Sequence, residues 1–269
     1  MTAAYYELLL PRESAWPVLA HVPHASTNIP PKFRASMLID DAVLRREIVR
    51  LTDWEVDKLF GWVTERGGVV FASKLSRLVF DPERFPDDAQ EPMAAVGMGV
   101  VYTRTTTGEP LAHITPEEQD RRLAELYHPY HQALTEAVSC LLEQFGRVTI
   151  LDCHSFPTEP LPTEMDHSGE RPDICIGTDE FHSPTALAHE LESRLTKAGF
   201  AVRRNFPYSG ALVPQAFLNR DSRVTSVMIE VRRALYCDET TGKRSADFDS
   251  VRERIEQAVA GAISATTKG

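Results

Sequence analysis

The sequence of 269 residues lacks the features of several large classes of protein. Its longest apolar runs fall far short of the roughly 20 residues that span a bilayer, so no membrane span is expected. The first residues, MTAAYYELLL, have no basic segment ahead of a long apolar run and do not resemble a signal peptide. Basic residues are also few: 29 Lys and Arg stand against 39 Asp and Glu, a net charge of −10. That balance argues against nucleic acid as a partner, because a phosphate backbone attracts basic surfaces.

Cysteine is scarce and irregularly spaced. The four cysteines, at positions 140, 153, 175 and 237, form no CxxC pair and no other zinc-finger spacing. We interpret them as reduced, mostly buried thiols of a cytoplasmic protein. The sequence contains no internal repeat, low-complexity tract or linker that would divide it. With 42% hydrophobic residues, it has enough apolar side chain for one large core, so we predict a single α/β domain over residues 1–269.

Short apolar runs alternate with longer amphipathic stretches. Because strands that alternate with helices imply a mostly parallel sheet covered on both faces, we predict a mixed, mostly parallel sheet flanked by helices. In such sheets ligands bind beyond the carboxyl ends of the strands. A weakly patterned stretch at 87–110 is expected to be a long functional loop. The predicted strands are 18–22, 69–72, 148–152, 174–177, 200–203 and 224–231. The predicted helices are 41–50, 52–66, 115–145 with a break or shift near Pro129, 183–198 and 247–263.

Two of these strands lead into a histidine beside small or polar residues, His24 in VPHAS and His154 in DCHS. Imidazole is the commonest side-chain ligand of zinc, and hydrolytic zinc sites typically combine three protein ligands with one water. Ordinary hydrogen-bonded histidines are the alternative. Asp53 is the candidate third ligand, although Thr52 and Asp53 also suit the start of a helix. Asp152 lies two positions before His154, so it points to the same side of the strand and can orient that imidazole.

Charged residues elsewhere suggest how a substrate is held and attacked. Arg77 and Arg84 are suited to bidentate binding of a carboxylate, and a solvated salt-bridge cluster is the alternative for both. Glu230 lies in the apolar run SVMIEVR, where a glutamate is rarely buried without a partner or a task. It is a candidate general base, and pairing with Arg232 or Arg233 is the alternative.

Together and in this order, eight short segments resemble the N-formylglutamate amidohydrolase family. Each segment is short, but their ordered combination spans roughly residues 20 to 236 and is fairly specific. The segments are VPHA at 22–25, TDW at 52–54, SRLVFD at 76–81, YHPYH at 127–131, LDCHS at 151–155, PDI at 172–174 with GT at 177–178, PYSG at 207–210 and IEV at 229–231.

The resemblance implies a phosphorylase/hydrolase-like α/β fold related to zinc carboxypeptidases. It also implies one divalent metal ion, Zn²⁺, and hydrolysis of the amide bond of a small acidic acyl-amino-acid. Carried over to this sequence, the metal ligands are His24, Asp53 and His154, and the general base is Glu230. Arg77 faces the acyl oxygen, and Arg84 and Tyr208 bind the substrate.

The sequence departs from the family pattern at one informative place. Family members commonly read Asp-Leu-Asn-Arg where this chain has Asp81-Pro82-Glu83-Arg84. Glu83 adds a negative charge beside Arg84, and Pro82 fixes its own φ and removes a backbone donor. The family's glycine pair after the tyrosine turn is also reduced to Gly210-Ala211. We expect these changes to affect the choice of substrate more than the reaction.

Two other readings of the same residues are open. A carboxypeptidase or peptidoglycan-type amidase would use the same metal framework, but Thr27 stands where a zinc carboxypeptidase has the glutamate of His-x-x-Glu. A non-catalytic protein that binds small anions would keep the fold without needing the metal. The sequence does not indicate an oligomeric state.

Overall fold

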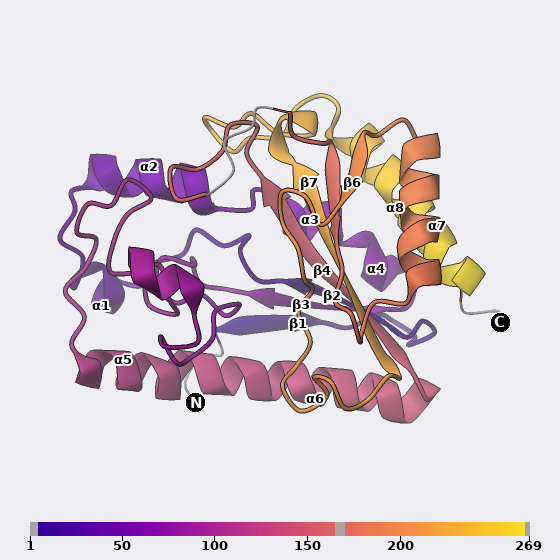
Figure 1. Cartoon of the computed structure of the whole chain (residues 1–269), viewed down its shortest axis with the longest axis horizontal. Helices are drawn as coiled ribbons and strands as arrows, with labels where there is room; N and C mark the ends of the chain where they lie inside the picture. Colours follow the sequence, from indigo (N-terminus) through magenta and orange to yellow (C-terminus); the bar gives the residue numbers. More distant parts are fainter. Residues whose placement is uncertain (1–4, 165–169, 267–269) are drawn as a thin grey trace.

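The computed structural model describes residues 5–164 and 170–266. Its centre is a seven-stranded sheet in the order β1-β3-β2-β4-β7-β5-β6 (Figure 1). Neighbouring strands are parallel except for the β1–β3 and β5–β7 pairs. The prediction of a mixed, mostly parallel sheet flanked by helices is confirmed. The strands are β1 (Tyr6–Leu9), β2 (Val18–Val22), β3 (Val69–Ser73), β4 (Val148–Phe156), β5 (Ile174–Gly177), β6 (Val202–Arg204) and β7 (Val224–Arg232).

Helices cover both faces of this sheet, with α6 on one side and α7 and α8 on the other (Figure 1). None of the helices in the described part of the chain is long and apolar enough to cross a membrane. The helices are α1 (Pro31–Arg34), α2 (Asp41–Leu51), α3 (Val56–Leu59), α4 (Trp62–Glu65), α5 (Pro116–Arg122), α6 (His128–Phe145), α7 (Thr185–Lys197) and α8 (Phe248–Thr266), with the π-helical turn η2 (Leu123–Tyr127) and the 3-10 helices η1 (Pro92–Val96) and η3 (Arg233–Leu235).

Alternation of side chains along the central strands builds two hydrophobic cores. Leu151 of β4 and Val227 of β7 belong to the core under α3, α4, α7 and α8, whereas Ile150 and Val224 belong to the core under α6. β4 and β7 pair over nine residues, from Val148 with Val224 to Phe156 with Arg232. Residues two positions apart on a strand share a face, and so do residues that pair across neighbouring strands. Alternation and register together therefore decide which polar side chains of β4 and β7 point to the α6 side.

The stretch 52–66 is not the single helix that the sequence predicted. Thr52 ends α2 in an extended conformation with ψ 133°, and Glu55 has a left-handed φ of 60°. A continuous helix cannot pass through either conformation, so α3 and α4 are separate helices of four residues each. The capping pattern at 52–55 was therefore misread. The extended connection instead brings Asp53 beside His24, whose carbonyl accepts a hydrogen bond from the Asp53 backbone N–H at 3.0 Å.

The break or shift predicted near Pro129 is a π-helical turn, which shifts the helix without interrupting it. α5 continues through η2 directly into α6, and Pro129 lies at the start of α6. Proline has no N–H to donate, and the wider turn before it accommodates the missing bond. Such turns are frequent at functional sites, and Tyr127, His128 and His131 line the cleft described below.

Four other differences concern strands of the sheet and one short helix. β4 runs four residues beyond the predicted 148–152, so His154 lies within the strand and not after it. The outermost strand β1 and the four-residue helix α1 were not predicted. β1 pairs only with β3 and is largely exposed, so it lacks the buried apolar run that marks the inner strands. β6 starts at Val202 rather than at Phe200.

Arg122 ties α5 to the segment that follows β3. Its side chain is buried, and Nη1 donates to the Val79 carbonyl at 3.0 Å while Nη2 donates to the Ser36 hydroxyl at 2.9 Å. Nε also donates to Glu118 at 2.7 Å. Val79 lies two residues before Asp81, which takes part in the site. Arg122 therefore anchors the loop that carries Asp81.

Replacement of this anchor should cost stability. We expect Arg122→Met to lower the free energy of unfolding by about 2–4 kcal/mol, because the buried Val79 carbonyl and Ser36 hydroxyl lose a charged donor. Arg121→Met is the matched control: Arg121 pairs with the same Glu118 but is exposed, so its loss should change stability by about 0.5 kcal/mol or less. Urea denaturation measures both, and equal small effects would contradict the anchoring role of Arg122.

Candidate metal centre and active site

A cleft of about 1290 Å³ opens where β2, β4 and β7 approach their carboxyl ends. These strands are parallel neighbours, so the residues at their ends come together at one edge of the sheet, as the sequence predicted. All seven residues expected to form the site line this cleft, and they are His24, Asp53, Arg77, Arg84, His154, Tyr208 and Glu230.

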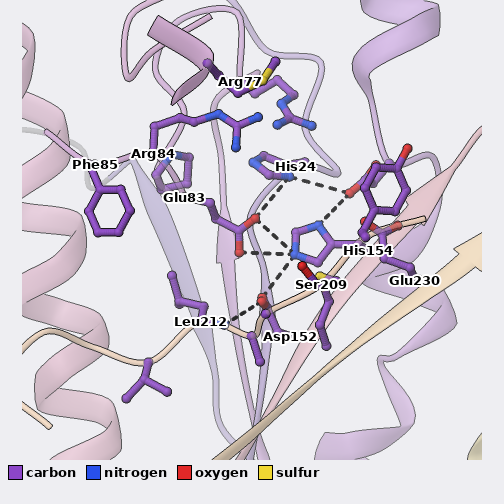
Figure 2. Close-up of a pocket in the computed structure, with 18 of the residues that line it drawn as sticks. His24, Arg77, Glu83, Arg84, Phe85, Asp152, His154, Ser209, Leu212 and Glu230 are labelled. Carbon is purple, nitrogen blue, oxygen red and sulfur yellow. Dashed lines mark hydrogen bonds and ion pairs between the residues drawn. The ribbon is translucent and has the colours of Figure 1, made fainter. Parts of the chain in front are cut away.

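Two buried histidines are held in matching orientations. Nε2 of His24 lies 2.8 Å from Oδ1 of Asp81, and Nε2 of His154 lies 3.1 Å from Oδ1 of Asp152. The Asp152 contact is the one expected from the alternation of side chains along β4. The opposite nitrogens, Nδ1 of His24 and of His154, face Oδ2 of Asp53 at 3.7 and 3.2 Å. Figure 2 shows the two rings turned toward each other.

These three donor atoms fit a divalent metal. Two ligands of a tetrahedral zinc ion, each 2.0–2.1 Å from the metal, lie about 3.3 Å apart, close to the distances from Asp53 to the two imidazoles. Nδ1 of His24 is buried, and among the described residues no group forms a hydrogen bond with it. A carboxylate that fixes the far nitrogen of each imidazole is the usual support of a histidine ligand. Neither Asp81 nor the 2.8 Å contact was anticipated from the sequence.

The electrostatics of the cluster favour a cation. Burial lowers the pKa of His154, but Glu83, Asp152 and Asp53 outweigh burial and raise this pKa well above its ordinary value. Burial likewise opposes ionisation of Asp53, yet His154, His24 and Arg233 lower its pKa below the usual range. The Asp53 carboxylate thus stays ionised because positive charge lies close to it. A divalent ion at this place would add to that positive charge.

Arg233 is a buried residue of the site that the sequence did not identify. Its Nη2 donates to Oδ1 of Asp53 at 3.1 Å, its Nε to the Ser155 hydroxyl at 3.1 Å, and its Nη1 to the Arg50 carbonyl at 2.7 Å. It therefore holds the second oxygen of Asp53 while Oδ2 faces the imidazoles. The only hint in the sequence was that Arg233 lies just after the predicted strand that carries Glu230. Its partner Asp53 lies 180 residues away in the chain, so spacing could not link the two.

Glu230 is the cross-strand neighbour of His154, on the side of the sheet that faces α6. It is 8% exposed, and its Oε2 forms no hydrogen bond with the described residues. Burial raises the pKa of Glu230 to about 8. The alternative pairing with the adjacent arginines is not observed, because Arg232 pairs with Asp173 and Arg233 with Asp53. Glu230 thus presents an unengaged carboxyl oxygen to the cleft.

Arg77 and Arg84 lie on one side of His24 (Figure 2). Arg77 donates to Oδ2 of Asp81 at 2.7 Å and to the Tyr102 hydroxyl at 3.0 Å, so it forms a salt bridge, but a largely buried one and not the solvated cluster of the alternative. Arg84 is less engaged: its Nε lies 3.6 Å from Asp81 and forms no hydrogen bond with the described residues. A buried guanidinium nitrogen without a hydrogen-bond partner is suited to binding an anionic group of a ligand.

Tyr208 lies on another wall of the cleft. Its hydroxyl donates to Oε1 of Glu164 at 2.9 Å, and its ring packs edge-on against Phe156 at 5.8 Å between centroids. Arg171 lies 5.8 Å above the same ring. These contacts fix the aromatic face where a ligand would meet it.

The loop from Asp81 to Arg84 is held by residues of η2 and α6. Nε2 of His131 lies 2.8 Å from the Pro82 carbonyl, and the Tyr127 hydroxyl donates to the Arg84 carbonyl at 3.1 Å. Burial lowers the pKa of His131 to about 4, so its ring is neutral near pH 7 and donates through Nε2–H. His131 thus positions the loop that carries Glu83 and Arg84.

A second cluster, His21 with Glu83 and Asp152, also has ligand atoms within 4.8 Å of one another. Both ring nitrogens of His21 already have partners, Asp152 at 3.0 Å and the Tyr130 hydroxyl at 2.8 Å. In the first cluster, by contrast, Nδ1 of His24 has no hydrogen-bond partner among the described residues, so the first cluster is the better candidate for a metal site.

A cleft at the carboxyl edge of a mixed, mostly parallel sheet, with carboxylates and imidazoles at its base, is an arrangement suited to hydrolytic enzymes of α/β architecture. The family model for N-formylglutamate amidohydrolase matches residues 16–237, and the chain belongs to this family. It is 29% identical over 240 residues to an N-formylglutamate deformylase of Pseudomonas aeruginosa, with 87% of this chain and 86% of that protein covered. A Pseudomonas putida protein of the same name is 29% identical over 230 residues, with 83% of each covered.

The crystal structure of an N-formylglutamate amidohydrolase from Ralstonia eutropha superposes with a TM-score of 0.86 at 26% identity, over 99% of this chain and 100% of that one. Fold and family are therefore those of an amidohydrolase, and the resemblance seen in the sequence is confirmed.

The neutral state of His131 predicts a pH dependence of stability. The unfolded chain takes up a proton on this residue near pH 6.5, whereas the folded chain does so only near pH 4. Between these values the unfolded state binds more protons, so stability is lost as the pH falls. We expect wild type to lose stability relative to His131→Gln, which retains a donor for Pro82, between pH 6.5 and 4. Denaturation curves at several pH values measure this, and parallel curves would exclude a neutral, buried His131.

Proposed function

We propose that this chain is a zinc-dependent amidohydrolase that cleaves the amide bond of an N-acyl acidic amino acid, with N-formylglutamate as the first substrate to test. His24, His154 and Asp53 would hold the ion. The observation that carries the proposal is the convergence of two imidazole Nδ1 atoms on one carboxylate oxygen, with a second carboxylate fixing each ring from behind. The names of the two Pseudomonas relatives support the substrate class.

A zinc ion in this place would supply Lewis acidity to the acyl oxygen and to the attacking water. Glu230 accepts a proton from that water as it attacks the acyl carbon, and then donates the proton to the departing nitrogen. The raised pKa of Glu230 suits both transfers, because a group near neutrality both takes and releases a proton. Arg77 lies on the cleft wall and would stabilise the negative charge that develops on the acyl oxygen.

Substrate binding is assigned to Arg84 and Tyr208. The guanidinium of Arg84, whose Nε forms no hydrogen bond with the described residues, would bind a carboxylate of the substrate, and Tyr208 would cover its carbon chain. We propose no macromolecular partner. A cytoplasmic location is supported by four cysteines that are all free, three of them buried.

The first prediction concerns the metal ligands. The purified protein should carry about one equivalent of a divalent ion, and His24→Ala and His154→Ala should each lose it. His128→Ala is the control, because His128 is an exposed residue of the same cleft and contacts none of the donor atoms. Elemental analysis and zinc titration measure the ion. Folded wild-type protein that neither contains nor binds zinc would refute the proposal.

The second prediction concerns Glu230. Glu230→Gln keeps the shape of the side chain but removes the proton acceptor, so kcat should fall by about a hundredfold or more. Metal content should stay the same, because Glu230 is not among the three proposed ligands. Glu136→Gln, an exposed carboxylate of the same cleft, should retain wild-type kcat. Steady-state kinetics on N-formylglutamate measure all three proteins. Near-normal turnover by Glu230→Gln would remove this residue from the mechanism.

A further inference from the structure

Glu83, the residue that departs from the family pattern, extends its carboxylate to both proposed imidazole ligands. Oε1 lies 3.2 Å from Nε2 of His154, and Oε2 lies 3.8 Å from Nδ1 of His24. The second distance joins Glu83 to the nitrogen that faces Asp53, and it nearly equals the 3.7 Å from Asp53 to that nitrogen. Figure 2 shows the carboxylate directed at the two rings from the side opposite Glu230.

The position of Glu83 is fixed by its backbone. Its N–H donates to Oδ1 of Asp81 at 3.1 Å, the same oxygen that holds Nε2 of His24. Pro82 restricts the chain one residue earlier, and its carbonyl is held by His131. The groups that orient His24 therefore also direct Glu83, whose side chain is only 16% exposed.

The Glu83 carboxylate has no arginine or lysine partner within ion-pair distance among the described residues. Its contacts are with imidazoles only, since Oε1 also lies 3.5 Å from Nδ1 of His21. Asp152 already accepts from His154 and His21, so a second carboxylate is not needed to orient either ring. Metal ligands are neutral imidazoles. Without a metal, protonated imidazole balances the charge of Glu83; with His24 and His154 as neutral ligands, a bound divalent ion would balance it instead.

We propose that Glu83 is a further carboxylate of the metal centre of this chain. This inference rests on the proposed function and makes it more specific. Glu83 strengthens the binding of a divalent ion and raises the affinity for ions that favour oxygen ligands, such as Mn²⁺, relative to Zn²⁺. An asparagine at this position would have no charge to contribute.

The experiment compares wild type, Glu83→Asn, Glu83→Asp and Glu136→Gln. Asn and Asp have the same length and differ in charge, and both are one methylene shorter than Glu. Dissociation constants for Zn²⁺ and Mn²⁺ are measured on metal-stripped protein by competition with a chelator, which needs no substrate. Glu83→Asn, with the residue common in the family, should bind both ions more weakly by roughly 10- to 100-fold, with the larger loss for Mn²⁺. Glu83→Asp should also lose affinity for metal, because its shorter side chain would not bring the carboxylate to the ion. Glu136→Gln should bind both ions as wild type does.

Two results would overturn the inference and leave the proposed function standing. One is unchanged affinity for both ions in Glu83→Asn. The other is wild-type affinity in Glu83→Asp with equal losses for the two ions in Glu83→Asn, which would show a general effect of charge without contact. Wild-type protein that binds neither ion would refute both proposals. Circular dichroism and thermal unfolding of each variant confirm that the compared proteins are folded.

Discussion

The site depends on two buried imidazoles that are each clamped at Nε2 by a carboxylate. Asp152 clamps His154 from within the same strand, and Asp81 clamps His24 from the loop after β3. Each clamp needs support of its own. Asp81 is held by Arg77 and the Tyr102 hydroxyl, and Oδ2 of Asp152 accepts from the Leu212 backbone at 2.9 Å.

The clamps work as a unit because every member is buried and ionised or hydrogen-bonded. A buried carboxylate without a cation or donor would be costly, so each one constrains the orientation of its neighbours. Arg233 extends this constraint to Asp53 and, through the Arg50 carbonyl, to the end of α2. The two imidazoles and Asp53 are thus oriented by groups from β4, η3 and the loop after β3, and this explains how short, weakly distinctive motifs can form one site.

Much of this arrangement follows from local patterns in the sequence. Apolar runs located the inner strands, and the strand-end rule brought His24, His154 and Glu230 to one edge. The period of two along β4 placed Asp152 behind His154. The stretch 52–66 was misread because Thr52 and Asp53 satisfy a helix-capping pattern, while the left-handed Glu55 and the His24 contact have no local signal. The roles of Arg233, Asp81 and Glu83 depend on partners distant in the chain or on side-chain direction, so composition and spacing could not reveal them.

The continuous pairing of β4 with β7 has a consequence for how this chain can change in evolution. The register places His154 opposite Glu230 over an unbroken run of nine pairs. Insertion or deletion of one residue in either strand would move one of these side chains to the other face of the sheet. Changes of length in either strand would therefore disrupt the site. Single substitutions at the apolar positions of the strands would leave the register unchanged. Variation in length among related chains is expected to collect in the segments around the cleft, such as 87–110. Gain or loss of residues there would reshape the walls while the base keeps its chemistry.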